Sequence, residues 1–351
     1  TEFRRARIYL SGLLYDNVQF KAEYNFSDGD AEFKDVYLAM SNLPVVGNVK
    51  LGHIKEPFSL EEQTSGKYLT FMERALPNAL VQGRNTGVLL HDQVLEDRMT
   101  WALGFFRTAD DFGNGSDDGD YAVTARITGL PWYADEGRKL LHLGVAYSHH
   151  FRNGPLRFNA RPEAHLSDFS YLDTGVFETD DMELFGLEAA YKQGPFSLQG
   201  EYIRSDVTSV RRTNLDFFRF RDEDDLTFDG YYVAASYVLT GEDRPYDRKS
   251  GAFVRLKPRN NFSLKEDGGW GAFELALRFS NLDLNDGLIR GGEEDNWTAA
   301  LNWYLNPHSR ISMSYTRAEI NRDRPGSAGR VFRRGYRGGL DVLQTRFQVD
   351  F

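Results

Sequence analysis

The chain has 351 residues and no cysteine, which excludes a disulfide framework and a thiolate metal site. Its 52 acidic residues outnumber its 42 basic ones, and the formal net charge of −10 argues against nucleic acid as a partner. The sequence contains no apolar run of about 18 residues, which excludes a transmembrane helix. It begins in polar sequence at Thr1, so we expect any targeting segment to have been removed.

The composition suggests strands of which only one face is apolar. Aromatic residues reach 14%, glycines number 33, and the mean hydropathy is only −0.52. This combination suits a membrane barrel, whose strands present every second residue to lipid. A large soluble β-protein would share part of the same signature.

Apolar and polar residues alternate along much of the chain, as in half-buried strands. In residues 18–26, Val18 and Phe20 alternate with Gln19 and Lys21, and the alternation continues to Phe26. The pattern predicts fifteen strands, in chain order over residues 3–13, 18–26, 32–41, 48–56, 86–95, 98–107, 121–129, 140–150, 183–193, 196–202, 228–240, 273–280, 297–305, 310–320 and 343–351.

The predicted connections alternate between short and long. Short turns are expected at Leu13–Asp16, Asn42–Gly47, Leu95–Asp97, Gln193–Pro195 and Asn306–Ser309. Long polar connections are expected at 108–120, 151–182, 203–227, 282–296 and 321–340. This segregation of lengths is typical of outer-membrane barrels. We therefore predict an all-β protein, a transmembrane antiparallel up-and-down barrel, with residues 1–351 as a single domain.

Strand parity makes this prediction more specific. Fifteen alternating strands place the first and last strands in the same direction, whereas a bacterial barrel has an even number with both ends in the periplasm. We expect sixteen strands in the full protein, with one of them before Thr1.

Two segments depart from this pattern. Residues 57–85 carry too much apolar surface for a solvated loop, and we expect them to be the constriction loop, packed in the barrel lumen or on a neighbouring subunit. Ser59…Glu62 and Thr70…Glu73 have the spacing of capping boxes, so one or two short helices are expected there. Residues 241–269 form a connection that is long for the periplasmic side.

Several stretches resemble the phosphate-selective porin O and P family over nearly the whole chain. They are FRRAR at 3–7, GHIKEPFSLEEQTS at 52–65, TFMERALPNA at 70–79, GPFSLQGEYIRS at 194–205, LTGEDRPYDRKSGAF at 239–253, ELALRFSNLDLNDG at 274–287 and LNWYLNP at 301–307. The resemblance implies a homotrimeric, sixteen-stranded porin of the bacterial outer membrane. It would allow passive diffusion of small anionic solutes such as phosphate or polyphosphate, without a cofactor.

The resemblance also implies which residues meet the anion. Arg4 and Arg5 match the family's paired arginines, Lys67 matches a basic residue of the constriction loop, and Arg161 lies where selective members carry an arginine cluster. With neighbouring cations on the same segments, the candidate substrate-binding residues are Arg4, Arg5, Lys67, Arg74, Arg157 and Arg161. Glu163 stands where the selective members continue with arginine.

Other charged groups have simpler interpretations. Lumen arginines such as Arg126, Arg278 and Arg346 are expected to pair with lumen acids, for which Glu188, Glu201 and Glu274 are the candidates. The basic outer loop 321–340 would concentrate anions, remain solvated or bind lipopolysaccharide phosphates. The acidic loop 108–120 lacks the spacing of a calcium loop, so no metal site is expected.

No catalytic motif is present, and we do not expect an enzyme. The alternative to an anion porin is a non-selective structural or receptor barrel of the outer membrane. A soluble, β-rich, carbohydrate-active enzyme is the third interpretation, and it would not require detergent.

Overall fold

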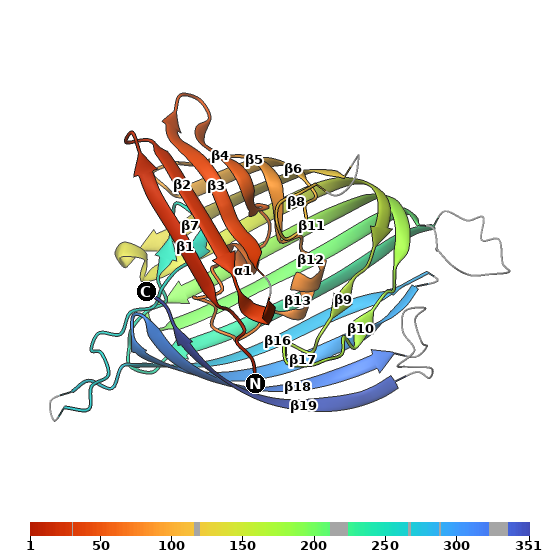
Figure 1. Cartoon of the computed structure of the whole chain (residues 1–351). Coiled ribbons are helices and arrows are strands. Elements are labelled where there is room, and N and C mark those ends of the chain that lie inside the picture. The colour runs from red at the N-terminus through yellow and green to blue at the C-terminus, as the bar shows by residue number, and fades with distance from the viewer. Residues whose placement is uncertain (30, 116–119, 211–223, 266–267, 288, 323–335) are drawn as a thin grey trace.

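A single antiparallel sheet of fifteen strands dominates the computed structural model, which describes residues 1–29, 31–115, 120–210, 224–265, 268–287, 289–322 and 336–351. The sheet curves around the segment that holds the short helix α1 (Leu60–Gln63) (Figure 1). Its strands are β1 (Arg7–Leu14), β2 (Val18–Asn25), β3 (Glu32–Leu43), β4 (Gly47–Lys55), β5 (Arg84–Val94), β6 (Met99–Arg107), β7 (Tyr121–Ala134), β8 (Lys139–Leu156), β11 (Phe177–Gln193), β12 (Phe196–Val210), β13 (Asp224–Val238), β16 (Ala272–Asp286), β17 (Ile289–Asn306), β18 (Ser309–Arg322) and β19 (Tyr336–Val349). All fifteen predicted strands are confirmed.

The strands pair in chain order from β1 to β19, and every pair is antiparallel. As the first and fifteenth strands, β1 and β19 run in the same direction. Between these two strands the part of the chain that the structure describes shows no pairing.

The remaining elements are short. Beside α1 there are the 3-10 turns η1 (Ser27–Gly29), η2 (Leu76–Leu80) and η3 (Asp135–Gly137), and two small strand pairs, β9 (Asn159–Ala160) with β10 (Leu172–Asp173) and β14 (Tyr246–Asp247) with β15 (Ala252–Phe253). None of the helices in the described residues has the length and hydropathy needed to cross a membrane.

The outer face of the sheet carries an apolar belt between two aromatic bands. Near the short turns, Trp303 stacks on Phe273 with the rings 5.6 Å apart. Six residues along the same strand, Trp297 contacts Phe279 at 5.0 Å. Exposed aliphatic side chains such as Leu301 lie between the two bands. Aromatic bands that flank an apolar belt are the signature of a barrel wall in a bilayer.

The two faces exchange polarity at the strand ends remote from the short turns, which we call the outer ends. On β16, Leu282 and Leu284 are fully buried inside, whereas Asp283 between them lies on the outer face. The sequence of such a segment resembles a polar loop. For this reason the prediction of a long connection at 282–296 was wrong. Instead β16 continues to Asp286, which pairs with Ile289.

Part of the interior is filled by apolar side chains. The largest buried cluster joins the inner face of the outer ends from β8 to β17 with the segment after β4 and with the β9–β10 hairpin. Its members are Phe58, Leu76, Leu80, Ala146, Leu156, Phe158, Ala160, Leu172, Phe177, Met182, Leu184, Ile203, Val207, Val210, Leu226, Phe228, Leu282, Leu284 and Ile289. The barrel interior is therefore not a uniformly wet cylinder.

Position 52 in β4 accepts only glycine. Its φ is +145°, and a Cβ added to it would lie 2.2 Å from the carbonyl oxygen of Val36. We expect Gly52→Ala to strain the β3–β4 pairing by about 1–3 kcal/mol and to lower the temperature at which the barrel loses its SDS resistance. Gly129→Ala is the matched control, because a Cβ there would meet no atom within 4 Å. Equal stability of the two variants in heated gels would contradict this account.

Candidate functional site

The segment between β4 and β5, residues 56–83, lies inside the sheet, and we call it the inner segment (Figure 1). It turns into α1 at Ser59, whose Oγ accepts a hydrogen bond from the Glu62 amide at 3.1 Å. The free amides of Leu60 and Glu61 donate to the Glu201 carboxylate on β12, at 2.9 and 2.7 Å. The predicted cap at Ser59 is therefore confirmed, and a wall residue completes it.

The second expected helix is the 3-10 turn η2, which begins at Leu76 rather than after Thr70. Thr70 is held by the wall instead: its hydroxyl donates to Glu274 at 3.3 Å, and its carbonyl accepts from Asn302 at 2.8 Å. Competition from these side chains explains why the capping spacing at Thr70 produces no helix.

Side chains of the sheet also bind the carbonyl groups of the inner segment. Arg310 donates to the Leu69 carbonyl at 2.7 Å and Arg346 to the Met72 carbonyl at 2.6 Å. Arg5 donates to the Gly66 carbonyl at 2.8 Å. Between these bonds, Phe71 packs on the small wall residues Ala234, Ala276 and Ala300. The inner segment is thus fixed against the β13–β19 side of the wall.

A buried charge junction fastens the inner segment to an outer hairpin. Arg278 on β16 is fully buried and bonds Glu61 of α1 at 3.2 Å and Glu163 at 2.6 Å. Glu163 belongs to the β9–β10 hairpin and also accepts from Thr298 at 2.7 Å. Arg278 therefore joins an outer connection, the wall and the inner segment.

Positive charge is in excess around Glu73 of the inner segment. Arg4 donates to both oxygens of Glu73 at 3.1 Å, and Arg346 binds the same carboxylate. Burial alone would raise the pKa of Glu73, but the hydrogen bond and charge of Arg4 hold it below its usual range. Burial and the charge of Arg4 lower the pKa of Arg5. Arg4 and Arg346 thus share one carboxylate, and its charge also acts on Arg5.

The structure brings together three of the six predicted anion-binding residues. Arg4 and Arg5 meet at Glu73 and Gly66, and Lys67 follows directly in the chain, 3.6 Å from Asp350 and over the ring of Tyr9.

The other three predicted residues have different surroundings. Arg74 binds Glu62 at 3.0 Å and the carbonyls around α1, so its guanidinium is used within the inner segment. Arg157 forms a two-bond pair with Asp173 across the β9–β10 hairpin. Arg161 is exposed and donates to the His165 carbonyl at 2.6 Å.

Arg161 is nevertheless linked to the arginine cluster through the N-terminal residues. The imidazole of His165 lies 2.9 Å from the Glu2 carboxylate, two residues before Arg4. Glu163, although two residues from Arg161, directs its carboxylate at Arg278 instead. Glu163 therefore acts as a buried partner of the wall.

The expected pairing of lumen arginines with acids holds for all three, with partly different acids. Arg126 binds Glu188 at 2.7 Å, as predicted. Arg278 binds Glu61 and Glu163, and Arg346 binds Glu73. These acids come from the inner segment and the β9–β10 hairpin, whereas the prediction considered only acids on the strands.

Sequence reasoning missed the role of the long connection after β13. Residues 241–258 fold back into the sheet, where Arg126 donates to the Gly251 carbonyl at 2.9 Å and Phe253 packs with Leu60 of α1. Lys192 binds Asp243 at 2.7 Å. The buried pair Ala252–Phe253 within a polar turn was the available signal.

The charged loops contain no metal cluster within the described residues. Asp110 accepts from the amides of its own turn, at 2.9 Å from both Phe112 and Asn114. Residues Asp117, Asp118, Asp222 and Glu223, and the arginines of loop 321–340 at 324, 330, 333 and 334, lie outside the described residues. Of that loop, Arg322 donates to the carbonyls of Tyr171 and Asp173.

A membrane-wide antiparallel sheet, an inward-folded segment and cations along the interior define an outer-membrane porin. The family model described as phosphate-selective porin O and P matches residues 1–351. The chain therefore belongs to this family: it is an anion porin of the bacterial outer membrane and not an enzyme.

Two related sequences illustrate the match. The chain is 30% identical over 370 residues to an uncharacterised protein of Caulobacter vibrioides, covering 100% of this chain and 68% of that protein. It is 26% identical over 358 residues to porin O of Pseudomonas aeruginosa, covering 91% of this chain and 77% of that protein.

Solved outer-membrane proteins share the fold. The anion-selective porin from Comamonas acidovorans has a TM-score of 0.52 at 14% identity, with 99% of this chain and 89% of that chain covered. OmpT of Vibrio cholerae has a TM-score of 0.53 at 11% identity, with 98% and 89% covered.

Arg278 provides the test of how the inner segment is held. We expect Arg278→Met to leave Glu61 and Glu163 buried without their cation, to destabilise the barrel by roughly 3–5 kcal/mol and to increase the current noise of single channels. The control is Arg317→Met, since Arg317 pairs with Asp341 on the exposed outer face. Unchanged stability and quiet channels for Arg278→Met would show that the junction does not hold the segment.

Proposed function

We propose that small anions such as phosphate or polyphosphate diffuse through this barrel along a cationic passage that runs from Arg161 past Arg4 and Arg5 to Lys67. The observation that carries the proposal is the excess of arginines around Glu73, where Arg4, Arg5 and Arg346 face a single acid. Fixed cations in a narrow aqueous passage attract anions, because low-dielectric walls focus their field.

The uneven filling of the interior supports this route for the passage. Apolar side chains fill the β8–β17 side, and the inner segment lies against β13–β19. The wall that remains has a smaller apolar cluster around Ile54 and Leu89. On β1–β5 it also carries polar side chains: Arg7, Tyr9, Lys21, Glu23, Asp35, Tyr37, Lys50 and Arg84. We infer that solutes pass between this wall and the inner segment, and that residues 57–85 narrow the passage as its constriction loop.

Arginine suits this role because its flat guanidinium pairs with two phosphate oxygens at once. Arg74 and Arg157 contribute less, since each is already paired with a carboxylate at close range. Glu163 is neutralised by Arg278, so it reduces the field of Arg161 less than its place in the sequence suggests.

A structural or receptor barrel without selectivity is the second candidate. The filled interior and the inward-folded residues 241–258 favour it, because both reduce the open cross-section. Planar-bilayer recordings separate the two functions: a receptor barrel would show little or no ion-selective conductance.

We further propose a homotrimer in contact with lipid and lipopolysaccharide. The resemblance to trimeric family members is the main support. The outer face of β1–β4 suits a subunit seam, since it is apolar and strongly exposed at Ile8, Leu10, Leu38 and Leu51.

Reversal potentials in a salt gradient test the cationic passage. We expect Arg5→Gln combined with Lys67→Gln to lower the anion-to-cation permeability ratio by roughly fivefold per charge removed, given about 1 kcal/mol for two charges at close range in water. Lys139→Gln is the control, because Lys139 pairs with Asp135 on an exposed turn. An unmoved reversal potential in the double variant would show that these cations do not select the solute.

Native mass spectrometry tests the homotrimer. We expect native mass spectrometry of the detergent-extracted protein to find three copies, and Leu38→Glu, which places a charge on the proposed seam, to shift the population toward single copies. Leu301→Glu is the comparison on the opposite wall. A wild-type protein that is monomeric under mild detergent would contradict the trimer.

A further inference from the structure

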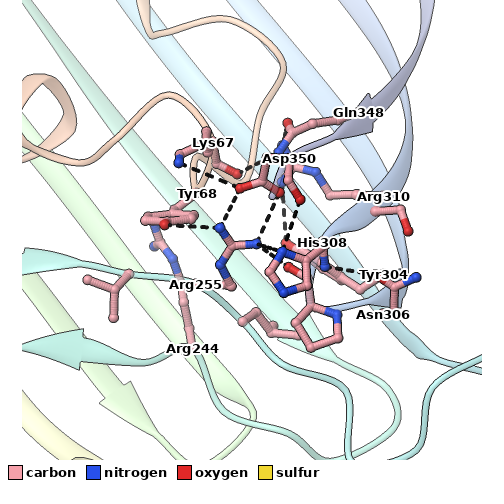
Figure 2. A pocket seen from close by; sticks show the side chains of 14 residues that line it. Lys67, Tyr68, Arg244, Arg255, Tyr304, Asn306, His308, Arg310, Gln348 and Asp350 are labelled. Atoms are coloured by element: carbon pink, nitrogen blue, oxygen red, sulfur yellow. Dashed lines mark hydrogen bonds and ion pairs between the residues drawn. The ribbon is translucent and has the colours of Figure 1, made fainter. Parts of the chain in front are cut away.

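A small hollow lies between the inner segment and the strand ends beside it (Figure 2). Four elements distant in sequence line it: the inner segment, the folded-back connection after β13, the β17–β18 turn and the end of β19. The lining residues are Lys67, Tyr68, Arg244, Val254, Arg255, Leu256, Tyr304, Asn306, Pro307, His308, Ser309, Arg310, Gln348 and Asp350.

The lining of the hollow is strongly cationic. Three arginines and one lysine face a single acid, Asp350. Two of the arginines, Arg244 and Arg310, are at least nine-tenths buried. Cations so far removed from water are held there only where other groups or ions compensate them.

Arg255 and Asp350 lie at the centre of the hollow, as Figure 2 shows. Both amino groups of the Arg255 guanidinium bind the two Asp350 oxygens, one of them at 3.0 Å. The same guanidinium donates to the Tyr68 hydroxyl at 3.3 Å, and Lys67 lies 3.6 Å from Asp350 on the other side. This two-bond arrangement is also the one by which arginine binds phosphate.

The guanidinium of Arg310 uses its two amino groups but not its Nε donor. Its two amino groups donate to the Leu69 carbonyl at 2.7 Å and to Gln348 at 3.1 Å. Its buried Nε has no partner among the described residues. A buried donor without an acceptor is costly, so a ligand oxygen that reached it would be stabilised.

We propose that this hollow is an oxyanion-binding site at the periplasmic end of the passage, and that the Asp350 carboxylate occupies it as a tethered competitor of the transported anion. The ligand is a dissolved oxyanion of phosphate's size and charge. It exchanges with Asp350 for the Arg255 guanidinium and gains Lys67 and Arg310 as further donors. The proposal rests on the anion-porin function and adds to it a specific site with a built-in competitor.

The proposal predicts that removing the competitor strengthens binding. Asp350→Asn keeps the shape of the side chain but removes its charge, so it should lower the inorganic phosphate concentration that half-blocks the chloride current by about tenfold. Arg255→Gln should raise that concentration by a similar factor. Asp135→Asn is the matched control, because it removes one acid from another periplasmic turn, on the exposed surface.

Equilibrium dialysis of the detergent-solubilised trimer or monomer against labelled inorganic phosphate gives a second readout that does not depend on conductance. Heat-modified gel mobility establishes that each variant has folded. If Asp350→Asn fails to fold, Arg255→Gln carries the test, since it should weaken phosphate binding while chloride current persists.

The outcomes separate this proposal from the proposed function. A wild-type channel without anion preference would overturn the function itself. An anion-selective wild type in which Asp350→Asn binds phosphate no more tightly than Asp135→Asn, or in which Arg255→Gln binds it equally well, would overturn the site and leave the porin standing.

Discussion

The structure depends on one constraint: the inner segment carries irregular backbone into the middle of a membrane barrel, where unpaired amides and carbonyls are costly. Side chains of the strands form hydrogen bonds with these amides and carbonyls individually. Glu201 accepts from the amides that open α1, and Arg310 and Arg346 donate to carbonyls further on. The polar inner face of the sheet is therefore in large part a scaffold for one loop.

This constraint also shapes the electrostatics of the interior. An arginine that binds a carbonyl oxygen keeps its full charge, whereas one that binds a carboxylate is largely neutralised. Arg310 and Arg5 belong to the first kind, and Arg126 to the second. The same residues that hold the inner segment thus leave positive charge beside it, which is how a chain of net charge −10 would present the proposed cationic passage.

The strands were predictable because lipid imposes a strict period of two on the outer face, as at Trp297 and Leu301. Beyond the lipid the outer face no longer needs to be apolar, and the apolar residues face inward instead. The sequence of the hairpin around Leu282 and Leu284 therefore resembles a polar loop. The site was only partly predictable. Arg4, Arg5 and Lys67 follow from motifs, but the pairing of Arg278 with Glu61 and Glu163 joins positions 217 and 115 residues apart, which no local pattern records.

The length of the outer ends affects how solutes enter the barrel from the medium. β17 has 18 residues, which at about 3.3 Å per residue is far more than the ~25 Å apolar band requires, even with tilt. The excess extends the hydrogen-bonded sheet beyond the apolar band on this part of the wall, whereas β1–β6 have only 8 to 12 residues each. A solute arriving from the medium therefore meets an entrance whose rim is high on one side and low on the other.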